Sequence, residues 1–93
     1  MRIEILYFAE FKEITNKARE GIELNEGTVK ELAKQLVTKY PDAKRLLMDD
    51  DDHGLKPTIS LAINEELMKK EDFSELALSN GDKVAFLLPI SGG

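Results

Sequence analysis

The chain of 93 residues contains no cysteine, no tryptophan and a single histidine. Without cysteine it has no disulfide bond, no thiolate nucleophile, no CxxC redox pair and no cysteine-ligated zinc site. One histidine excludes a multi-histidine metal centre and leaves little for acid–base catalysis near neutral pH. We therefore expect no metal site and no catalytic residue in the chain itself.

Positive charge and long hydrophobic runs are also scarce. The 13 Lys and Arg residues are outnumbered by 18 Asp and Glu residues, which gives a formal net charge of −5. An acidic chain is poorly suited to bind a phosphate backbone, so we expect no nucleic-acid partner. The longest apolar run, Val84–Ile90, is far shorter than the ~20 residues of a membrane span, and no signal-peptide pattern follows Met1. These features predict a cytoplasmic protein without a membrane partner.

One amphipathic helix is predicted over residues 28–40. Its apolar positions recur at i, i+3 and i+4: Val29, Leu32, Ala33, Leu36, Val37 and Tyr40. Thr28 and Glu31 have the spacing of a capping box, and Pro41 ends the helix. Lysines occupy the opposite side: Lys30, Lys34 and Lys39.

Four strands are predicted, over residues 2–8, 17–24, 58–64 and 83–88. Period-two alternation assigns one set of side chains to the core: Ile3, Ile5, Tyr7, Ile22, Leu24, Ile59, Leu61, Ile63, Val84, Phe86 and Leu88. Glu20 interrupts that alternation in the second strand. The first and last strands are apolar on both faces, which favours central positions. Turns are expected at 64–66 and 79–82.

The order of these elements predicts a single α+β domain, a mixed sheet of four to five strands covered on one face by one main helix. Short helices are possible at 9–14, 43–48 and 72–76. The segment Asp49–Gly54 begins like a calcium loop. However, His53 stands where that motif requires Asp or Asn, and Ser60 stands where it requires the bidentate Glu. A solvated acidic loop is the better interpretation.

The last residues, Leu88-Pro89-Ile90-Ser91-Gly92-Gly93, resemble the end of the ubiquitin-like sulfur carriers, in particular the small subunit of molybdopterin synthase. The stretches Ile5–Glu10, Ile63–Leu67 and Asn80–Pro89 are similar to that family too. The resemblance covers most of the chain outside residues 43–57. It implies a β-grasp fold over residues 1–93, with a flexible tail at 89–93.

The resemblance also implies a chemistry for Gly93. Its carboxylate would be adenylated by an activating adenylyltransferase that uses ATP and magnesium, and then converted to a thiocarboxylate by a sulfur donor system. The large synthase subunit would transfer that sulfur to precursor Z, so the domain itself would bind no cofactor. Gly92 and Ser91 would let the tail enter narrow active sites, since glycine has no Cβ. Pro89 ends the strand, and Ile90 follows it.

Phe8, Leu67 and Leu87 match the residues with which that family docks its catalytic partner. Parity places Leu6, Phe8 and Leu87 on the sheet face away from the helix, and exposed apolar clusters often mark interfaces. Other functions remain open. They are a ubiquitin-like modifier joined through Gly93 to target lysines, a sulfur carrier for thiamine or tRNA thiolation, and an interaction domain with an unmodified tail.

Overall fold

A computed structural model describes residues 1–48, 55–56, 58–68 and 76–88. Three expectations lie outside the described residues: the acidic Asp49–Gly54 segment, a helix at 72–76 and the tail at 89–93. The strands and helices occur in the order β1 (Arg2–Leu6), α1 (Glu10–Thr15), β2 (Arg19–Glu23), α2 (Val29–Lys39), a 3₁₀ turn η1 (Pro41–Ala43), α3 (Lys44–Leu47), β3 (Ser60–Ile63), β4 (Glu66–Leu67) and β5 (Lys83–Leu87).

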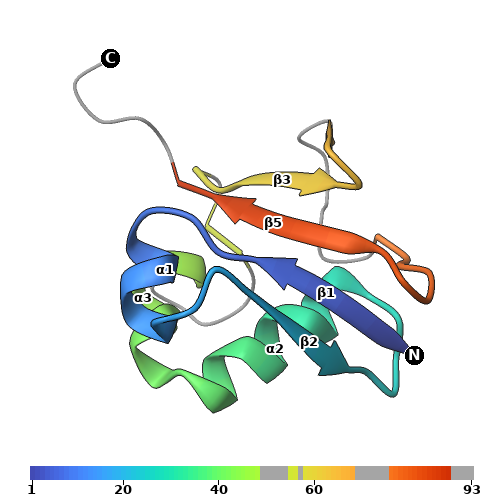
Figure 1. Ribbon diagram of the computed structural model, residues 1–93, viewed down its shortest axis with the longest axis horizontal. Helices are drawn as coiled ribbons and strands as arrows, with labels where there is room; N and C mark the ends of the chain where they lie inside the picture. Colours follow the sequence, from blue (N-terminus) through green and yellow to red (C-terminus); the bar gives the residue numbers. More distant parts are fainter. Residues whose placement is uncertain (49–54, 57, 69–75, 89–93) are drawn as a thin grey trace.

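The strands form one five-stranded mixed sheet in the order β2-β1-β5-β3-β4 (Figure 1). β1 and β5 are parallel neighbours, and the other pairs are antiparallel. The central placement of the first and last strands is therefore confirmed. Each predicted strand is present but shorter than its pattern. β4 was not predicted, because two residues are too few to show alternation.

The core lies between the sheet and the helices, and α2 covers the same face of the sheet as α1 and α3 (Figure 1). The residues predicted to face inward are buried, among them Ile3, Ile5, Leu61 and Val84 at 0% exposure, except Leu88, which is only partly buried against the core. Helix α2 contributes Val29, Leu32, Ala33 and Leu36 to this core. Short helices at the expected positions around Phe11 and Leu46–Leu47 close the end of the core.

The beginning of α2 follows the predicted cap only in part. The Thr28 hydroxyl accepts a hydrogen bond from the Glu31 N–H at 3.2 Å, as an N-cap residue does. The reciprocal bond of a capping box is replaced, because the Thr28 N–H donates to the Glu26 carbonyl and the Glu31 carboxylate accepts from Gln35. Thr28 alone caps the helix.

Candidate functional site: the outer sheet face

The register of the sheet aligns a row of side chains on the face away from α2. Arg19 pairs with Leu6, Leu6 with Ala85, Ala85 with Ala62, and Ala62 with Leu67. Paired residues share a face, and the neighbouring residues Ile5, Val84 and Ile63 point into the core. Four apolar side chains therefore cross the outer face from β1 to β4.

A second pair extends this row. Continuing the parallel register from Leu6 and Ala85 by two residues brings Phe8 level with Leu87. We define the outer apolar patch as Leu6, Phe8, Ala62, Leu67, Ala85 and Leu87. Phe8 is 51% exposed and Leu67 67% exposed, whereas Leu87 is half-buried. The three residues singled out for docking thus lie on one surface. The sequence pattern did not indicate Ala62.

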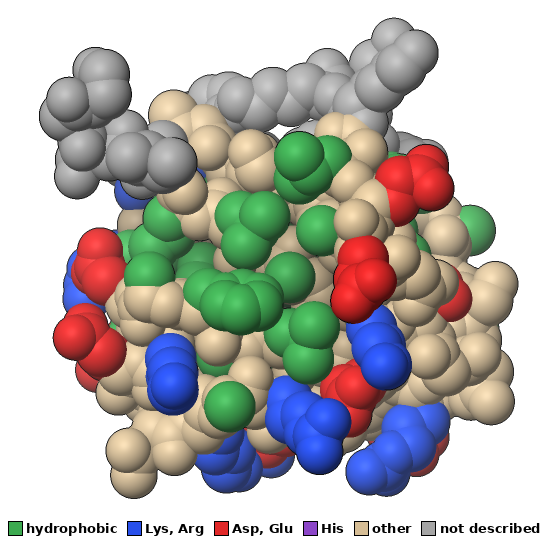
Figure 2. Space-filling view, turned by 45° about the horizontal axis from the view of Figure 1, so that its top comes forward, with side chains coloured by type: hydrophobic (Ala, Val, Ile, Leu, Met, Phe, Trp, Pro, Cys, Tyr) green, Lys and Arg blue, Asp and Glu red, His purple; other side chains and the backbone are tan. Residues whose placement is uncertain are grey.

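Figure 2 shows the molecule turned so that the side opposite α2 comes forward. Hydrophobic side chains gather over the middle of this face, with Lys and Arg along its lower border and Asp and Glu to either side. Small residues occupy the centre of the patch, since Ala85 and Ala62 stand between Leu6 and Leu67. In this row the large apolar side chains, Leu6 and Leu67, stand toward the two ends.

The two ends of the outer face differ. Toward the start of β5 it is polar, because Glu4 pairs with Lys83 and the Asn64 side chain bonds to the Lys83 N–H at 3.0 Å. Toward the end of β5 it is apolar. Because β1 and β5 are parallel, Phe8 and Leu87 lie at the edge where the chain continues toward residues 89–93. Gly93, Gly92, Ser91, Ile90 and Pro89 are outside the described residues.

The β3–β4 hairpin presents Leu67 to the outer face. Asn64 and Glu65 adopt positive φ angles of 52° and 71°, and asparagine tolerates this region better than most residues. The Asn64 amide donates to an Asp82 carboxylate oxygen at 3.0 Å, while the Asn64 N–H donates to the Lys83 carbonyl at 2.7 Å. These contacts fasten the hairpin to the start of β5. The predicted turn is confirmed, and Glu65 is one of its residues.

A second cluster, on the core side of β2, is polar. The Glu20 carboxylate accepts hydrogen bonds from the Tyr7 and Tyr40 hydroxyls at 2.8 and 2.9 Å and from the Lys17 and Lys39 ammonium groups. Burial acts to raise the pKa of Glu20, but these bonds outweigh it and lower the pKa to about 2. Burial and the same carboxylate raise the pKa of Tyr7.

The Glu20 cluster joins β1, β2 and α2. Its donors are far apart in the sequence, so the pattern showed only that Glu20 broke an alternation. Lys39 is exposed as expected, and its ammonium group also forms an ion pair with Glu20. Every buried side-chain polar atom of the described residues is hydrogen-bonded. The cluster therefore stabilises the fold and has no buried polar atom left to bind a ligand.

The described residues contain neither a membrane-spanning helix nor a metal-binding cluster. No helix among them is long and apolar enough to cross a membrane. Within the same part of the chain, no group of three or more His, Asp or Glu side chains is arranged to hold a metal ion.

A mixed five-stranded sheet wrapped on one face by a main helix is the β-grasp arrangement of ubiquitin-like proteins. The sequence pattern of the ThiS family matches residues 5–93, and the chain belongs to this family.

Two relatives carry the same description. The molybdopterin synthase sulfur carrier subunit of Chlamydomonas reinhardtii is 30% identical over 94 residues and covers all of both chains. The human protein of that description is 33% identical over 93 residues, 99% of this chain and 94% of its own.

Solved structures agree on the fold. The crystal structure of SAMP1 from Haloferax volcanii has a TM-score of 0.83 and 26% identity, with full coverage of both chains. A complex of subunits 1 and 2 of the molybdopterin-converting factor from Helicobacter pylori matches with a TM-score of 0.59, 22% identity and full coverage. The second likeness concerns the fold alone.

Proposed function

We propose that this protein is the sulfur carrier of molybdopterin synthase, its small subunit in molybdenum or tungsten cofactor biosynthesis. Full-length relatives of that description support the proposal. The observation that carries it is the position of the outer apolar patch, at the end of the sheet where β5 passes toward the Gly-Gly tail. A partner seated on the patch lies next to the point from which the tail departs.

The proposed chemistry takes place at the Gly93 carboxyl group. One carboxylate oxygen attacks the α-phosphorus of ATP, pyrophosphate leaves, and an acyl-adenylate forms. Sulfide from the donor system then attacks the carbonyl carbon, and the bond from that carbon to the phosphate oxygen breaks as AMP leaves. The sulfur of the resulting thiocarboxylate attacks precursor Z (cyclic pyranopterin monophosphate) in the active site of the large subunit. Water then cleaves the bond between that sulfur and the Gly93 carbonyl carbon, which returns the carboxylate.

The division of labour explains the composition. The sulfur is carried on a carboxyl carbon, so the carrier requires no cysteine. ATP and magnesium belong to the activating adenylyltransferase, and the catalytic groups belong to the large subunit. Gly92 and Gly93 have no Cβ and pass through narrow channels, and Ser91 adds a short polar side chain. The cytoplasm is where these partners would meet the carrier.

Intact-mass analysis of the protein from native cells tests the tail chemistry. We expect a fraction heavier by the exchange of one oxygen for one sulfur, which disappears when Gly93 is deleted. Deleting Gly93 is also expected to abolish cofactor synthesis, while the circular dichroism of the variant stays unchanged. Normal cofactor synthesis in the deletion strain would refute the proposal.

The docking role of the patch has its own test. Leu87→Asp and Leu67→Asp are expected to weaken binding to the large subunit by at least about 100-fold, because each places a charge in a desolvated interface. The matched control is Asn25→Asp, which adds one negative charge beyond the end of β2, away from the patch. Equal binding by all three variants would show that the large subunit docks elsewhere.

A ubiquitin-like modifier is the second candidate, favoured by the likeness to SAMP1 over the whole chain. In that case Gly93 would form an isopeptide bond with target lysines. Gly-Gly remnants on lysines in digests of native cells, absent after deletion of the gene, would demonstrate it. A thiocarboxylate without such remnants supports the carrier function alone.

A further inference from the structure

Strand β2 is an edge strand of the sheet (Figure 1). Every second residue of β2 turns its backbone N–H and C=O groups toward the free edge. Just outside the strand pair, the Met1 ammonium group donates to the Leu24 carbonyl, and the Leu24 N–H donates to the Met1 carbonyl. The Tyr7 N–H donates to the Ala18 carbonyl. Antiparallel alternation then turns the backbone groups of Arg19, Gly21 and Glu23 away from β1.

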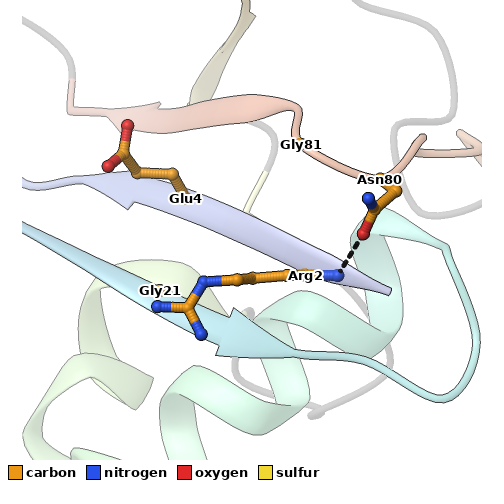
Figure 3. Close-up of a pocket in the computed structure, with 5 residues that line it drawn as sticks. All are labelled: Arg2, Glu4, Gly21, Asn80 and Gly81. Atoms are coloured by element: carbon orange, nitrogen blue, oxygen red, sulfur yellow. Dashed lines mark hydrogen bonds between the residues drawn. The ribbon is translucent and has the colours of Figure 1, made fainter.

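Space is available beside this edge. On the helix side, Gly21, Ile22, Glu23 and residues of α2 line a groove of about 320 Å³. A second hollow, of about 290 Å³, lies over the outer face of β1 and not beside the edge, and it is lined by Arg2, Glu4, Gly21, Asn80 and Gly81 (Figure 3). Figure 3 also shows the Arg2 side chain lying across Gly21, where a side chain of residue 21 would otherwise stand. Within the described residues, no backbone group pairs with the outward groups of β2.

The charges along the edge are self-complementary, although Glu23 also lies 3.8 Å from the Arg2 guanidinium of β1 in an exposed ion pair. Arg19 and Glu23 lie two residues to either side of Gly21, and all three share the outer face. If a second β2 approaches antiparallel, with Gly21 opposite Gly21 of the other copy, Arg19 faces Glu23 twice by symmetry. Opposite charges directly across an antiparallel pair are stabilising, and like charges are destabilising. The same register pairs the outward backbone groups of all three residues.

We infer that the β2 edge is a self-association surface, on which a second copy of this chain adds its β2 antiparallel about Gly21. The two sheets then become one, and an unpaired edge is covered. The outer apolar patch spans β1, β5, β3 and β4, so both copies keep it open for a partner. The dimer would thus hold two independent carriers, and it does not depend on the proposed chemistry of the tail.

The expected affinity is weak, because one short strand pair buries far less surface than a standard interface. Sedimentation equilibrium at physiological ionic strength, from about 10 µM to about 1 mM protein, covers the range expected of such an interface. We expect a monomer–dimer equilibrium within it. A protein that stays monomeric throughout would overturn the inference.

Charge reversal tests the register. Arg19→Glu and Glu23→Arg each place like charges opposite one another at two positions of the dimer. Each is expected to raise the dimer dissociation constant at least about tenfold. The double variant R19E/E23R restores both opposite-charge pairs and is expected to return within about threefold of the parent. Failure of the double variant to recover, with folding verified by circular dichroism, contradicts this register.

Two further measurements locate the contact. Amide exchange at Arg19, Gly21 and Glu23 is expected to slow with rising protein concentration, because those N–H groups become hydrogen-bonded. Leu67→Asp, which changes the outer apolar patch, is expected to leave the dimer intact. Loss of the dimer in L67D would assign self-association to the patch instead. If these amides are protected only when a different protein is added, and not when the concentration of this protein rises, the edge binds that other protein instead.

Discussion

The two faces of the sheet are made by the same strands and have different composition and exposure. On the inner face Ile5, Val84 and Ile63 pair across three strands and are at most 8% exposed. The adjacent residue on each strand, Leu6, Ala85 or Ala62, belongs to the outer row. In that row Ala85 is 5% exposed, and the row leads to Leu67, which is 67% exposed. Adjacent residues of one strand therefore belong to different surfaces, one to the core and the next to the outer apolar patch.

The difference shows why apolar residues appear on both parities of β1 and β5. Helix α2 covers the inner set, whereas the outer set ranges from the buried Ala85 to the exposed Leu67. The outer set is apolar at one end and polar at the other, where Glu4 pairs with Lys83. A confined exposed apolar area of this kind is typical of an interaction surface. The fold supports both faces with the same backbone hydrogen bonds.

Leucine truncation on each face gives the largest expected contrast. Leu61→Ala removes a fully buried side chain and is expected to cost about 3 kcal/mol of unfolding free energy, through lost transfer energy and a residual cavity. Leu67→Ala, on the neighbouring strand, is expected to change it by less than about 0.5 kcal/mol. Urea denaturation measures both. Similar losses in the two variants would mean that the outer patch also belongs to the core.

The Glu20 cluster is the polar exception on the inner face. Glu20→Gln is expected to cost about 1–2 kcal/mol near pH 7, because charge-assisted bonds are lost and the half-exposed lysines are partly screened. The matched control is Glu10→Gln, which removes an exposed ion pair with Arg45 and should cost less than about 0.5 kcal/mol.

The sign of its pH dependence follows from the pKa of Glu20, lowered from 4.5 to about 2 by its donors. A lowered pKa stabilises the folded state fully above pH 4.5, and this stabilisation is lost as the pH falls through about 2. The difference between parent and E20Q in thermal unfolding should therefore shrink over that interval. A constant difference from pH 7 to pH 2 would contradict the assignment.

Much of this arrangement was predictable from the sequence. Period-two alternation identified Ile3, Ile5 and Leu61 as core residues, and the 3.6-residue pattern identified α2, because each element buries one regular face. The outer positions of Phe8 and Leu87 followed from the same parity. For these elements, local pattern and tertiary packing agree.

The features that were missed depend on partners distant in sequence. Glu20 is inward-facing, and only the fold brings Tyr7, Tyr40 and Lys39 to its carboxylate. β4 has two residues and exists because the Asn64 turn returns the chain along β3. A short strand and a multi-donor carboxylate leave no periodic signal. The role of Gly93 followed from family resemblance, since no pattern of periodicity encodes it.

An effect of similar size is expected in the hairpin that carries Leu67. Asn64→Ala removes the side-chain bonds to Asp82 and Lys83 and forces alanine to a φ near 52°, so a loss of about 1–2 kcal/mol is expected. Asn64→Gly loses the same bonds without the backbone strain and should cost about half as much. Amide exchange at Lys83, whose N–H donates to Asn64, should accelerate in both variants, because that bond is lost in each. Equal stability of N64A and the parent would show that strand pairing alone holds the hairpin. The polar contacts of Asn64 would then contribute nothing to the position of Leu67 in the outer apolar patch.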